Sequence, residues 1–311
     1  MKRLNGFFLA ACLAALLAPA LAHAQLWTWT HEQMLDYTKA WTGDRFPDGR
    51  PKVPDALLNR ARGLSQEEVI VNFGGDAGSG GRGGQGPRYS QFTGGWQVLH
   101  PGKMLVGRAV TAAFMPARPD LDAVVTAKAK EKGIDTLNNQ HVIDMLQPGD
   151  VLVVDLYGKD EGGTIVGDNL FYYILQTTQT GGLVVNGGIR DLQGIAEMDM
   201  PAYYRTTHPS AIGGVTLAAV NVPIRIGDVT VMPGDVVVGD REGVAFVPPH
   251  LMEHVLDVAD TTHIHDEWTR KKFAEHKYKS SDIYGSPKDP ELKKEYEEYL
   301  KKRLAEIRSQ R

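Results

Sequence analysis

The sequence contains almost no cysteine. Cys12 is the only one in 311 residues, so the chain cannot form an internal disulfide, and no disulfide framework can hold its fold. Cys12 also lies in an amino-terminal segment that we predict to be removed. The mature chain would then have neither thiol catalysis nor thiolate ligands for a metal.

Excess positive charge is missing too. Lys and Arg number 34 against 38 Asp and Glu, which gives a formal net charge of −4. Loss of Lys2 and Arg3 with the leader would change that charge from −4 to −6. Because a mildly acidic chain without a basic stripe binds nucleic acid poorly, we expect no nucleic-acid partner.

Two common catalytic signatures are absent, the Gly-x-Ser-x-Gly elbow and the P-loop. The glycine-rich stretch 74–86 does contain a formal G-x-G-x-x-G, from Gly78 to Gly83. Pro87 follows it without an amphipathic helix, although a nucleotide-binding fingerprint needs a helix N-terminus at that point. We therefore interpret 74–86 as a loop.

A long apolar run occurs only at the amino terminus. A basic start, an apolar stretch from Phe7 to Leu17 and the small-x-small sequence Ala22-His-Ala24 are typical of a secretory signal cut before Gln25. A retained anchor is disfavoured because Pro19 interrupts the run. A lipoprotein box at Cys12 is disfavoured because apolar residues continue after it. We expect a secreted or periplasmic protein without membrane attachment.

Composition and turn signals divide the chain into a signal peptide (1–24) and three further parts. Residues 25–94 are predicted to form a helical and glycine-rich extension, 95–260 an α/β core, and 261–311 a helical extension. Thr30 can cap a helix over 31–41, and Ser65 to Glu68 has capping-box spacing. In the core we expect strands over 104–114, 151–156 and 183–186, and helices over 123–130, 169–176 and 192–198.

The carboxyl-terminal segment has the pattern of an amphipathic helix. Asp289 supplies an N-cap and Pro290 the first helical position. Apolar residues from Leu292 to Ile307 then recur every three or four positions. We expect the helix to pack on the protein's own body or on a neighbouring subunit. A membrane surface is disfavoured by the glutamates at 295, 297 and 298.

Residues 167–191 carry the most chemistry. A glycine–acid turn leads into a short apolar helix, a buried strand follows, and the strand ends in Arg190-Asp191. Two opposite charges at the end of a buried strand are energetically costly unless they bind a ligand or have another function. A small anion held by the arginine and a divalent metal held by the aspartate would serve both charges. The alternative is a structural ion pair in a surface turn.

This segment resembles the signature of the RraA-like family, which includes class II pyruvate aldolases acting on 4-hydroxy-4-methyl-2-oxoglutarate. The resemblance continues through Gln147–Asp155 and Asn221–Pro248 and covers about 95–260. Twenty-one residues separate Asp168 from Arg190, one more than the usual spacing, and the turn at 179–182 can hold the extra residue.

The resemblance implies a layered α/β/β sandwich of the swivelling-domain type with a barrel-like core, assembled as a homotrimer or a hexamer (a dimer of trimers). The family's site lies at a subunit interface and takes a small 2-oxo acid with Mg²⁺ or Mn²⁺. Carried over, Arg190 orients the substrate, Asp191 ligates the metal and Asp168 reaches the metal through water. The substrate's carboxylate is then bound by the turn of Gly167, Asp168, Asn169 and Leu170.

General chemistry also supports the reaction that the resemblance implies. Cleavage of a C–C bond beta to a ketone leaves an enolate, which a hard divalent cation stabilises as a Lewis acid. One carboxylate with waters and substrate oxygens suits Mg²⁺ or Mn²⁺ better than Zn²⁺. Arg190 offers bidentate recognition that lysine lacks. We therefore expect a metal-dependent lyase of the aldolase or oxaloacetate decarboxylase type.

Two alternatives stay open. The family also includes a non-catalytic regulator that binds a ribonuclease. That role would need a cytoplasmic partner, and the regulator type tends to lack the acid corresponding to Asp191. The other alternative is an exported metal-dependent enzyme that acts on another hydroxy or sugar acid, with the terminal extensions shaping its pocket.

Other polar residues are weaker candidates. His208 follows the motif and could approach a site, and Asp155 ends a buried strand on the expected side. The acids at 160 and 161 could lie outside the first ring of ligands but fit a solvated loop better. His263 and His265 stand two apart, which on a helix directs them to different sides, so surface positions are expected.

Overall fold

The structure is a computed structural model that describes residues 28–70, 91–135 and 138–309. The predicted signal peptide (1–24) and the glycine-rich loop (74–86) lie outside the described residues. In the part of the chain that is described, no helix is long and apolar enough to cross a membrane.

Four parallel strands form the centre of the molecule. Their order is β3 (Leu105–Pro116), β4 (Asp150–Asp155), β5 (Gly182–Ile189) and β6 (Ala202–Thr207). Their apolar runs are almost unbroken because both faces of the sheet are covered. The strands predicted over 104–114, 151–156 and 183–186 are confirmed.

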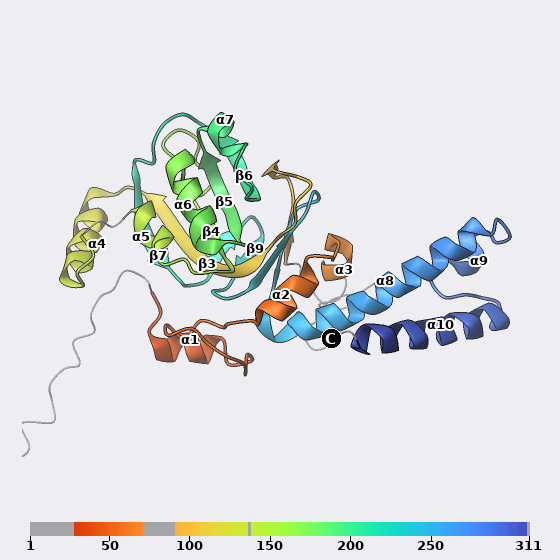
Figure 1. The fold of residues 1–311 in the computed structure, drawn as a ribbon. Helices are drawn as coiled ribbons and strands as arrows, with labels where there is room; N and C mark the ends of the chain where they lie inside the picture. Colours follow the sequence, from red (N-terminus) through yellow and green to blue (C-terminus); the bar gives the residue numbers. More distant parts are fainter. Residues whose placement is uncertain (1–27, 71–90, 136–137, 310–311) are drawn as a thin grey trace, which may run out of the picture.

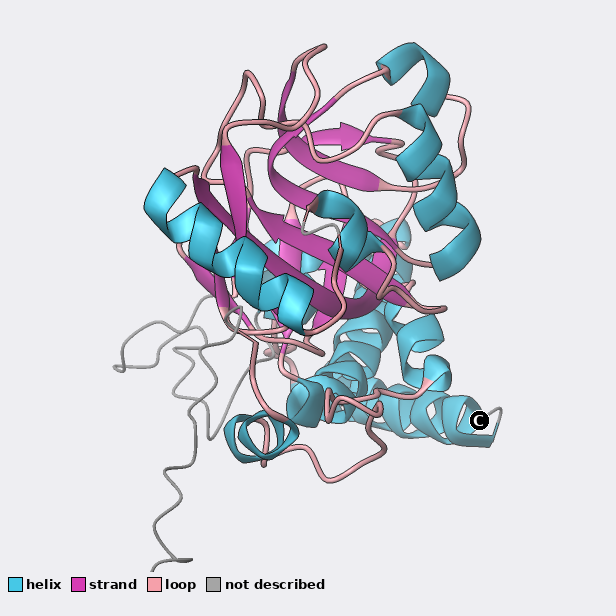
Figure 2. Cartoon of the chain, turned by 90° about the vertical axis from the view of Figure 1, so that its left-hand side faces the viewer, coloured by secondary structure: helices cyan, strands magenta, loops and turns pink. Residues whose placement is uncertain are grey.

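Antiparallel strands extend this centre on both sides. Within the described residues, nine strands join into one sheet, which curls (Figure 2), and β8 and β9 form a separate hairpin. The added strands have these bounds: β1 Phe92–Thr93, β2 Gln97–Leu99, β7 Val215–Val220, β8 Ile224–Ile226, β9 Val229–Val231, β10 Val236–Gly239 and β11 Val244–Val247.

Helices cover one face of the parallel strands (Figure 1). Phe171 and Ile174 of α6 (Asp168–Thr178) are buried in a cluster with Val154 and Val185 of the sheet. The helix predicted over 169–176 is therefore confirmed, whereas the one predicted over 192–198 is shorter. The remaining helices of this part are α4 (Pro119–Glu131), α5 (Asn139–Ile143) and α7 (Leu192–Ile195).

The other face has two coverings. The hairpin β8–β9 packs its apolar residues against alternate side chains of β3, β4 and β10. Near β10 and β11, the sheet contacts α2 (Asp55–Ala61), α3 (Gln66–Ile70) and the start of α8 (Met252–Ala274). These contacts give an α/β core with helices from both termini, which confirms the predicted fold class.

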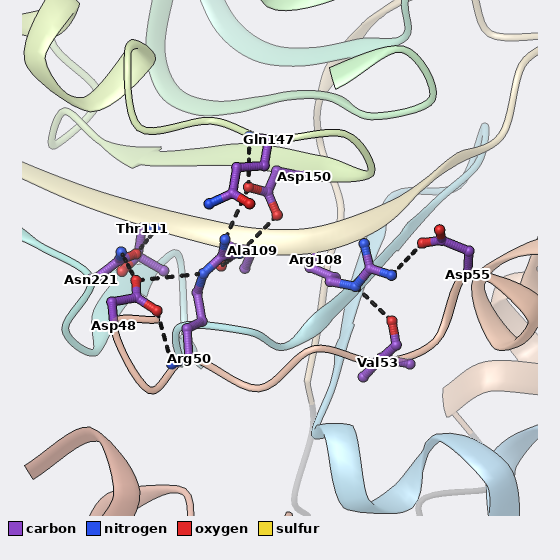
Figure 3. A network of polar contacts seen from close by, with 10 residues as sticks. All are labelled: Asp48, Arg50, Val53, Asp55, Arg108, Ala109, Thr111, Gln147, Asp150 and Asn221. Carbon is purple, nitrogen blue, oxygen red and sulfur yellow. Dashed lines mark hydrogen bonds and ion pairs between the residues drawn. The ribbon is translucent and has the colours of Figure 1, made fainter. Parts of the chain in front are cut away.

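The amino-terminal extension is fastened to the core by buried charges (Figure 3). Arg50 is 2% exposed and pairs bidentately with the fully buried Asp150, at 2.8 and 3.0 Å. Arg108 of β3 donates to the Val53 carbonyl at 2.6 Å and pairs with Asp55. The chain segment that leads into α2 is thereby fixed to the amino ends of β3 and β4.

Both predicted N-caps of this extension are present, while its first helix is shorter than expected. Thr30 and Gln33 form a capping box at α1 (His31–Tyr37), and Ser65 bonds Glu68 at α3. The helix stops at Tyr37 rather than Trp41, whose indole N–H donates to the Asp44 carbonyl at 2.8 Å.

The carboxyl-terminal helices project from the body as a pair (Figure 1). After the short η1 (Pro249–Leu251) and the long α8, the chain forms α9 (Ser280–Ile283) and returns along α8 as α10 (Pro290–Ser309). Asp289 accepts from the first turn of α10, as predicted. Trp268, Ile283 and Leu292 form a small core between the helices, so the amphipathic tail packs on the protein's own chain.

Candidate functional site

The glycine–acid turn and the Arg-Asp pair meet at one edge of the sheet. Parallel strands β4, β5 and β6 all end at this edge, where ligands of α/β proteins commonly bind. β5 ends at Ile189 and is followed by Arg190 and Asp191, while α6 begins at Asp168 on the adjacent connection. The Arg190 N–H donates to the Val166 carbonyl at 3.1 Å, which joins the two segments.

Gly167 is the contact point between them. A Cβ on this residue would lie 2.2 Å from Asp191 Oδ2 and 2.9 Å from Arg190 Nε, far inside van der Waals contact. The backbone of Gly167 is extended, with φ −110°, so the requirement for glycine is one of space. Removing one methyl group from this turn lets both charged side chains approach the start of α6.

Asp191 has a left-handed backbone, with φ 60° and ψ 38°, which aspartate tolerates better than most residues. This bend turns the chain from β5 into α7, and the Asp191 carbonyl accepts from Gly194 and Ile195. Its Oδ2 accepts from the Asp168 N–H and from Arg190 Nε, both at 3.3 Å. Among the described residues, nothing donates to Oδ1, and the side chain is 43% exposed.

A cavity of about 180 Å³ adjoins this cluster. Gly167, Leu170 and Arg190 line it on the side of the motif. The Leu170 N–H belongs to the first turn of α6 and has no acceptor among the described residues, as expected for a helix N-terminus. Other walls of the cavity are formed by Asn139 and Gln140 of α5 and by Ala211 and Ile212 of the loop after β6.

The loop that supplies Ala211 and Ile212 is fastened to the preceding connection. Ser210 Oγ accepts from the Gly162 N–H at 2.6 Å, and the Ser210 carbonyl accepts from the Thr164 hydroxyl. His208 Nδ1 lies 2.8 Å from the same Ser210 Oγ. His208 therefore lies near the site and holds a cavity wall through Ser210.

The carboxylates at this site could hold a hard divalent cation through Asp191 alone, with water and substrate oxygens as the other ligands. Among the described residues, no three His, Cys, Asp or Glu side chains gather as a metal cluster. Mg²⁺ is often held by one or two carboxylates together with water and substrate oxygens. Asp191, exposed and with Oδ1 available, matches that pattern.

The other candidate acids each accept hydrogen bonds of their own. Asp168 Oδ1 accepts from the N–H of the next residue, Asn169, at 2.7 Å, within the first turn of α6. Asp155 accepts from Tyr157 and Asn186, and Asp160 accepts from Thr206. These contacts hold loops at the same edge of the sheet.

The two histidines of α8 lie on the projecting helices. His263 contacts Glu68 of α3 at 3.3 Å, and His265 Nε2 lies beside the Gly285 carbonyl. Both histidines therefore contact residues outside the motif at 167–191.

Sequence reasoning did not identify the cavity walls of α5. Asn139 is 6% exposed and donates to the Ile165 carbonyl at 2.6 Å, which sets α5 beside the glycine–acid turn. The preceding Asn138 caps α5 by accepting from the Gln140 N–H. That cap could have indicated the helix from the sequence, but nothing in the sequence indicates that it borders the site.

The fold and the site together define an α/β protein that gathers an arginine, an aspartate and a helix N-terminus at the carboxyl edge of parallel strands. The family model described as Aldolase/RraA matches residues 82–246, more than half of the chain. The chain belongs to the RraA-like family, as its motif predicted.

Individual relatives agree with this family. A protein of Halalkalibacterium halodurans, provisionally named 4-hydroxy-4-methyl-2-oxoglutarate aldolase, is 37% identical over 120 residues, which are 39% of this chain and 56% of that protein. A protein of Ectopseudomonas mendocina with the same provisional name is 31% identical over 128 residues, 41% of this chain and 76% of its own. The chain thus spans only about half the length of the first of these relatives.

A solved structure gives the same fold. RraAS2 of Streptomyces coelicolor, described as an unusual member of the RNase ES inhibitor RraA protein family, is 27% identical to this chain. The superposition has a TM-score of 0.55 and covers 73% of this chain and all of RraAS2.

Proposed function

We propose that this protein is a divalent-metal-dependent lyase that cleaves a C–C bond of a small 2-oxo acid through a pyruvate enolate. The observation that carries the proposal is the meeting of Arg190 and Asp191 with Gly167 beside a small cavity. The provisional names of the relatives in Halalkalibacterium halodurans and Ectopseudomonas mendocina support the same reaction class.

The chain's own groups supply binding and orientation. Arg190 is 32% exposed and lines the cavity, so its guanidinium can bind the substrate's carboxylate. The N–H of Leu170 and the positive end of the α6 dipole face the same region and favour an anion there. A 2-oxo acid held this way would have its carboxylate at the turn.

Asp191 would hold Mg²⁺ or Mn²⁺ through its exposed carboxylate, and Asp168 would contribute through water. When bound, the cation supplies Lewis-acid stabilisation of the charge that develops as the C–C bond breaks. Arg190 Nε on Asp191 Oδ2 keeps the aspartate oriented and leaves Oδ1 for the cation.

Two accompanying proposals concern assembly and location. The resemblance supports a homotrimer or hexamer with the site at a subunit border. The amino-terminal sequence supports export to the periplasm or beyond.

The test is pyruvate release by the purified mature protein from oxaloacetate and from 4-hydroxy-4-methyl-2-oxoglutarate, coupled to a hydride-transfer assay. Each substrate is supplied with Mg²⁺ or Mn²⁺ and then with a chelator. We expect Asp191→Ala to abolish turnover and Arg190→Lys to lower it by about 10²-fold, because lysine cannot replace bidentate contact. Asp120→Ala, an exposed acid paired with Arg118, is the matched control and should be active.

Each other outcome assigns a different function. Metal binding through Asp191 without turnover of either compound would favour an enzyme for another hydroxy or sugar acid. Absence of both metal binding and turnover would favour a non-catalytic binding protein, the class to which the description of RraAS2 points.

A further inference from the structure

A second and larger cavity lies at the opposite end of the parallel strands. Its volume is about 430 Å³, within the range of small-molecule sites. It borders the turn at Gly181, where β5 begins, whereas the candidate active site lies beyond Ile189, where β5 ends. The eight residues of β5 separate the two sites by roughly 23 Å.

Arg62 lines this cavity with a charge that has no counterion. It follows α2, and partial burial lowers the pKa of its guanidinium by desolvation. Among the described residues, no carboxylate pairs with it, although Arg50, Arg108 and Arg190 each have an aspartate partner. Since a half-buried cation is costly without a partner, an anion is the missing complement.

The guanidinium is also anchored through only one of its three nitrogens. Its Nη2 donates to the Thr180 carbonyl at 2.9 Å and to the Val106 carbonyl at 3.3 Å. The Val106 carbonyl is available to Arg62 because β4 pairs with β3 only from Arg108 onward. The Nε and Nη1 groups donate to nothing in the described part of the chain, so each keeps an N–H for a single hydrogen bond to an oxygen of an anion.

The remaining lining limits the charge and shape of the ligand. Lys103 and Asp199 form an ion pair with each other at the cavity, so Arg62 alone contributes net charge, and Asp199 disfavours a second negative group. Met104, Leu175, Met200 and Pro201 add an apolar lining, and methionine adapts readily to ligand shape.

We propose that this cavity is a second ligand site, which takes a small monocarboxylate with a short apolar chain on Arg62. The proposal does not depend on the lyase activity, because the site lies at the other end of the sheet.

The test is isothermal titration of the mature full-length protein with hexanoate, and with inorganic phosphate as an anion that lacks an apolar body. We expect saturable hexanoate binding that is weaker by about ten- to a hundredfold in Arg62→Gln, since a hydrogen bond to a charged group is lost. A second variant, Thr180→Tyr, fills the cavity from an exposed position, leaves the charge unchanged, and should weaken binding as well. Arg190→Gln is the matched control and should bind hexanoate like the parent.

Three outcomes would overturn the proposal. One is hexanoate binding that persists unchanged in both Arg62→Gln and Thr180→Tyr. Another is loss in Arg190→Gln alone, which would place hexanoate at the candidate active site. The third is absence of saturable binding, and a changed elution volume of Arg62→Gln on size exclusion would then show that a neighbouring copy fills the cavity.

Discussion

Gly167→Ala should inactivate the candidate site while leaving the fold intact. The added methyl would lie 2.2 Å from Asp191 Oδ2, although ordinary contacts of this kind begin near 3.4 Å. Relieving that overlap requires a shift of about 1 Å in Asp191, or in the start of α6. A displacement of this size at a catalytic group costs on the order of 10²-fold in rate.

The effect on stability should be small by comparison. Gly167 has a negative φ, so alanine meets no backbone strain, and the change at this N-cap costs about 1 kcal/mol or less. The two expectations separate a site effect from a folding effect. Urea unfolding would report the stability, and pyruvate release and Mn²⁺ binding would report the site.

Gly194→Ala is the matched control on the neighbouring helix α7. Its added Cβ would lie 3.5 Å from the Asp168 Cβ, an ordinary contact, and alanine is the better helix former. This variant should retain activity and Mn²⁺ binding. Full activity and unchanged Mn²⁺ affinity in Gly167→Ala would refute the idea that this glycine exists to admit Asp191.

Two further substitutions test buried carboxyl groups. Asp150→Asn should lower the free energy of unfolding by about 3–5 kcal/mol, because it leaves Arg50 buried without its partner; a urea midpoint no lower than that of the exposed control Asp120→Asn would contradict this. Burial raises the pKa of Asp235 to about 7, against an ordinary 3.8, so the folded protein keeps this proton where the unfolded chain loses it. The stability that this group contributes is fully present below pH 4 and is lost as the pH rises to 7, by up to about 4 kcal/mol. The free energy of unfolding of Asp235→Asn should therefore increase relative to that of the parent from pH 5 to pH 8. A difference that stays constant between those pH values would show that the carboxyl is ionised throughout.

The sequence predicted the central elements well because local patterns specify them. The unbroken apolar runs of β3 and β4 and the caps at Thr30 and Asp289 were identified correctly. Helix ends were less accurate, since α1 stops where Trp41 finds a backbone acceptor and α7 stops after Ile195. Such ends depend on contacts that a local pattern does not contain.

In the candidate site, too, local sequence predicted some features and tertiary contacts decided others. Adjacency in sequence places Arg190 beside Asp191, and the family motif indicates that Gly167 belongs with them. The sequence did not indicate that the space of one methyl group decides their approach, nor that Asn139 borders the cavity. The role expected of Asp168, which is to reach a metal through water, stays a prediction; in the structure its Oδ1 accepts from the Asn169 N–H.

By itself, the sequence determined the strands β3, β4 and β5, the helix α6 between β4 and β5, the glycine–acid turn, the Arg-Asp pair and the family. Each of these depends on periodicity or on neighbours along the chain. Tertiary structure alone decided that Asp168 and Asp191 touch across 23 positions and that Arg50 pairs with Asp150 across 100. It also left Arg62 beside a cavity without a counterion. The physical reason is that charge pairing and free space depend on which distant segments pack together, and packing is a property of the whole chain.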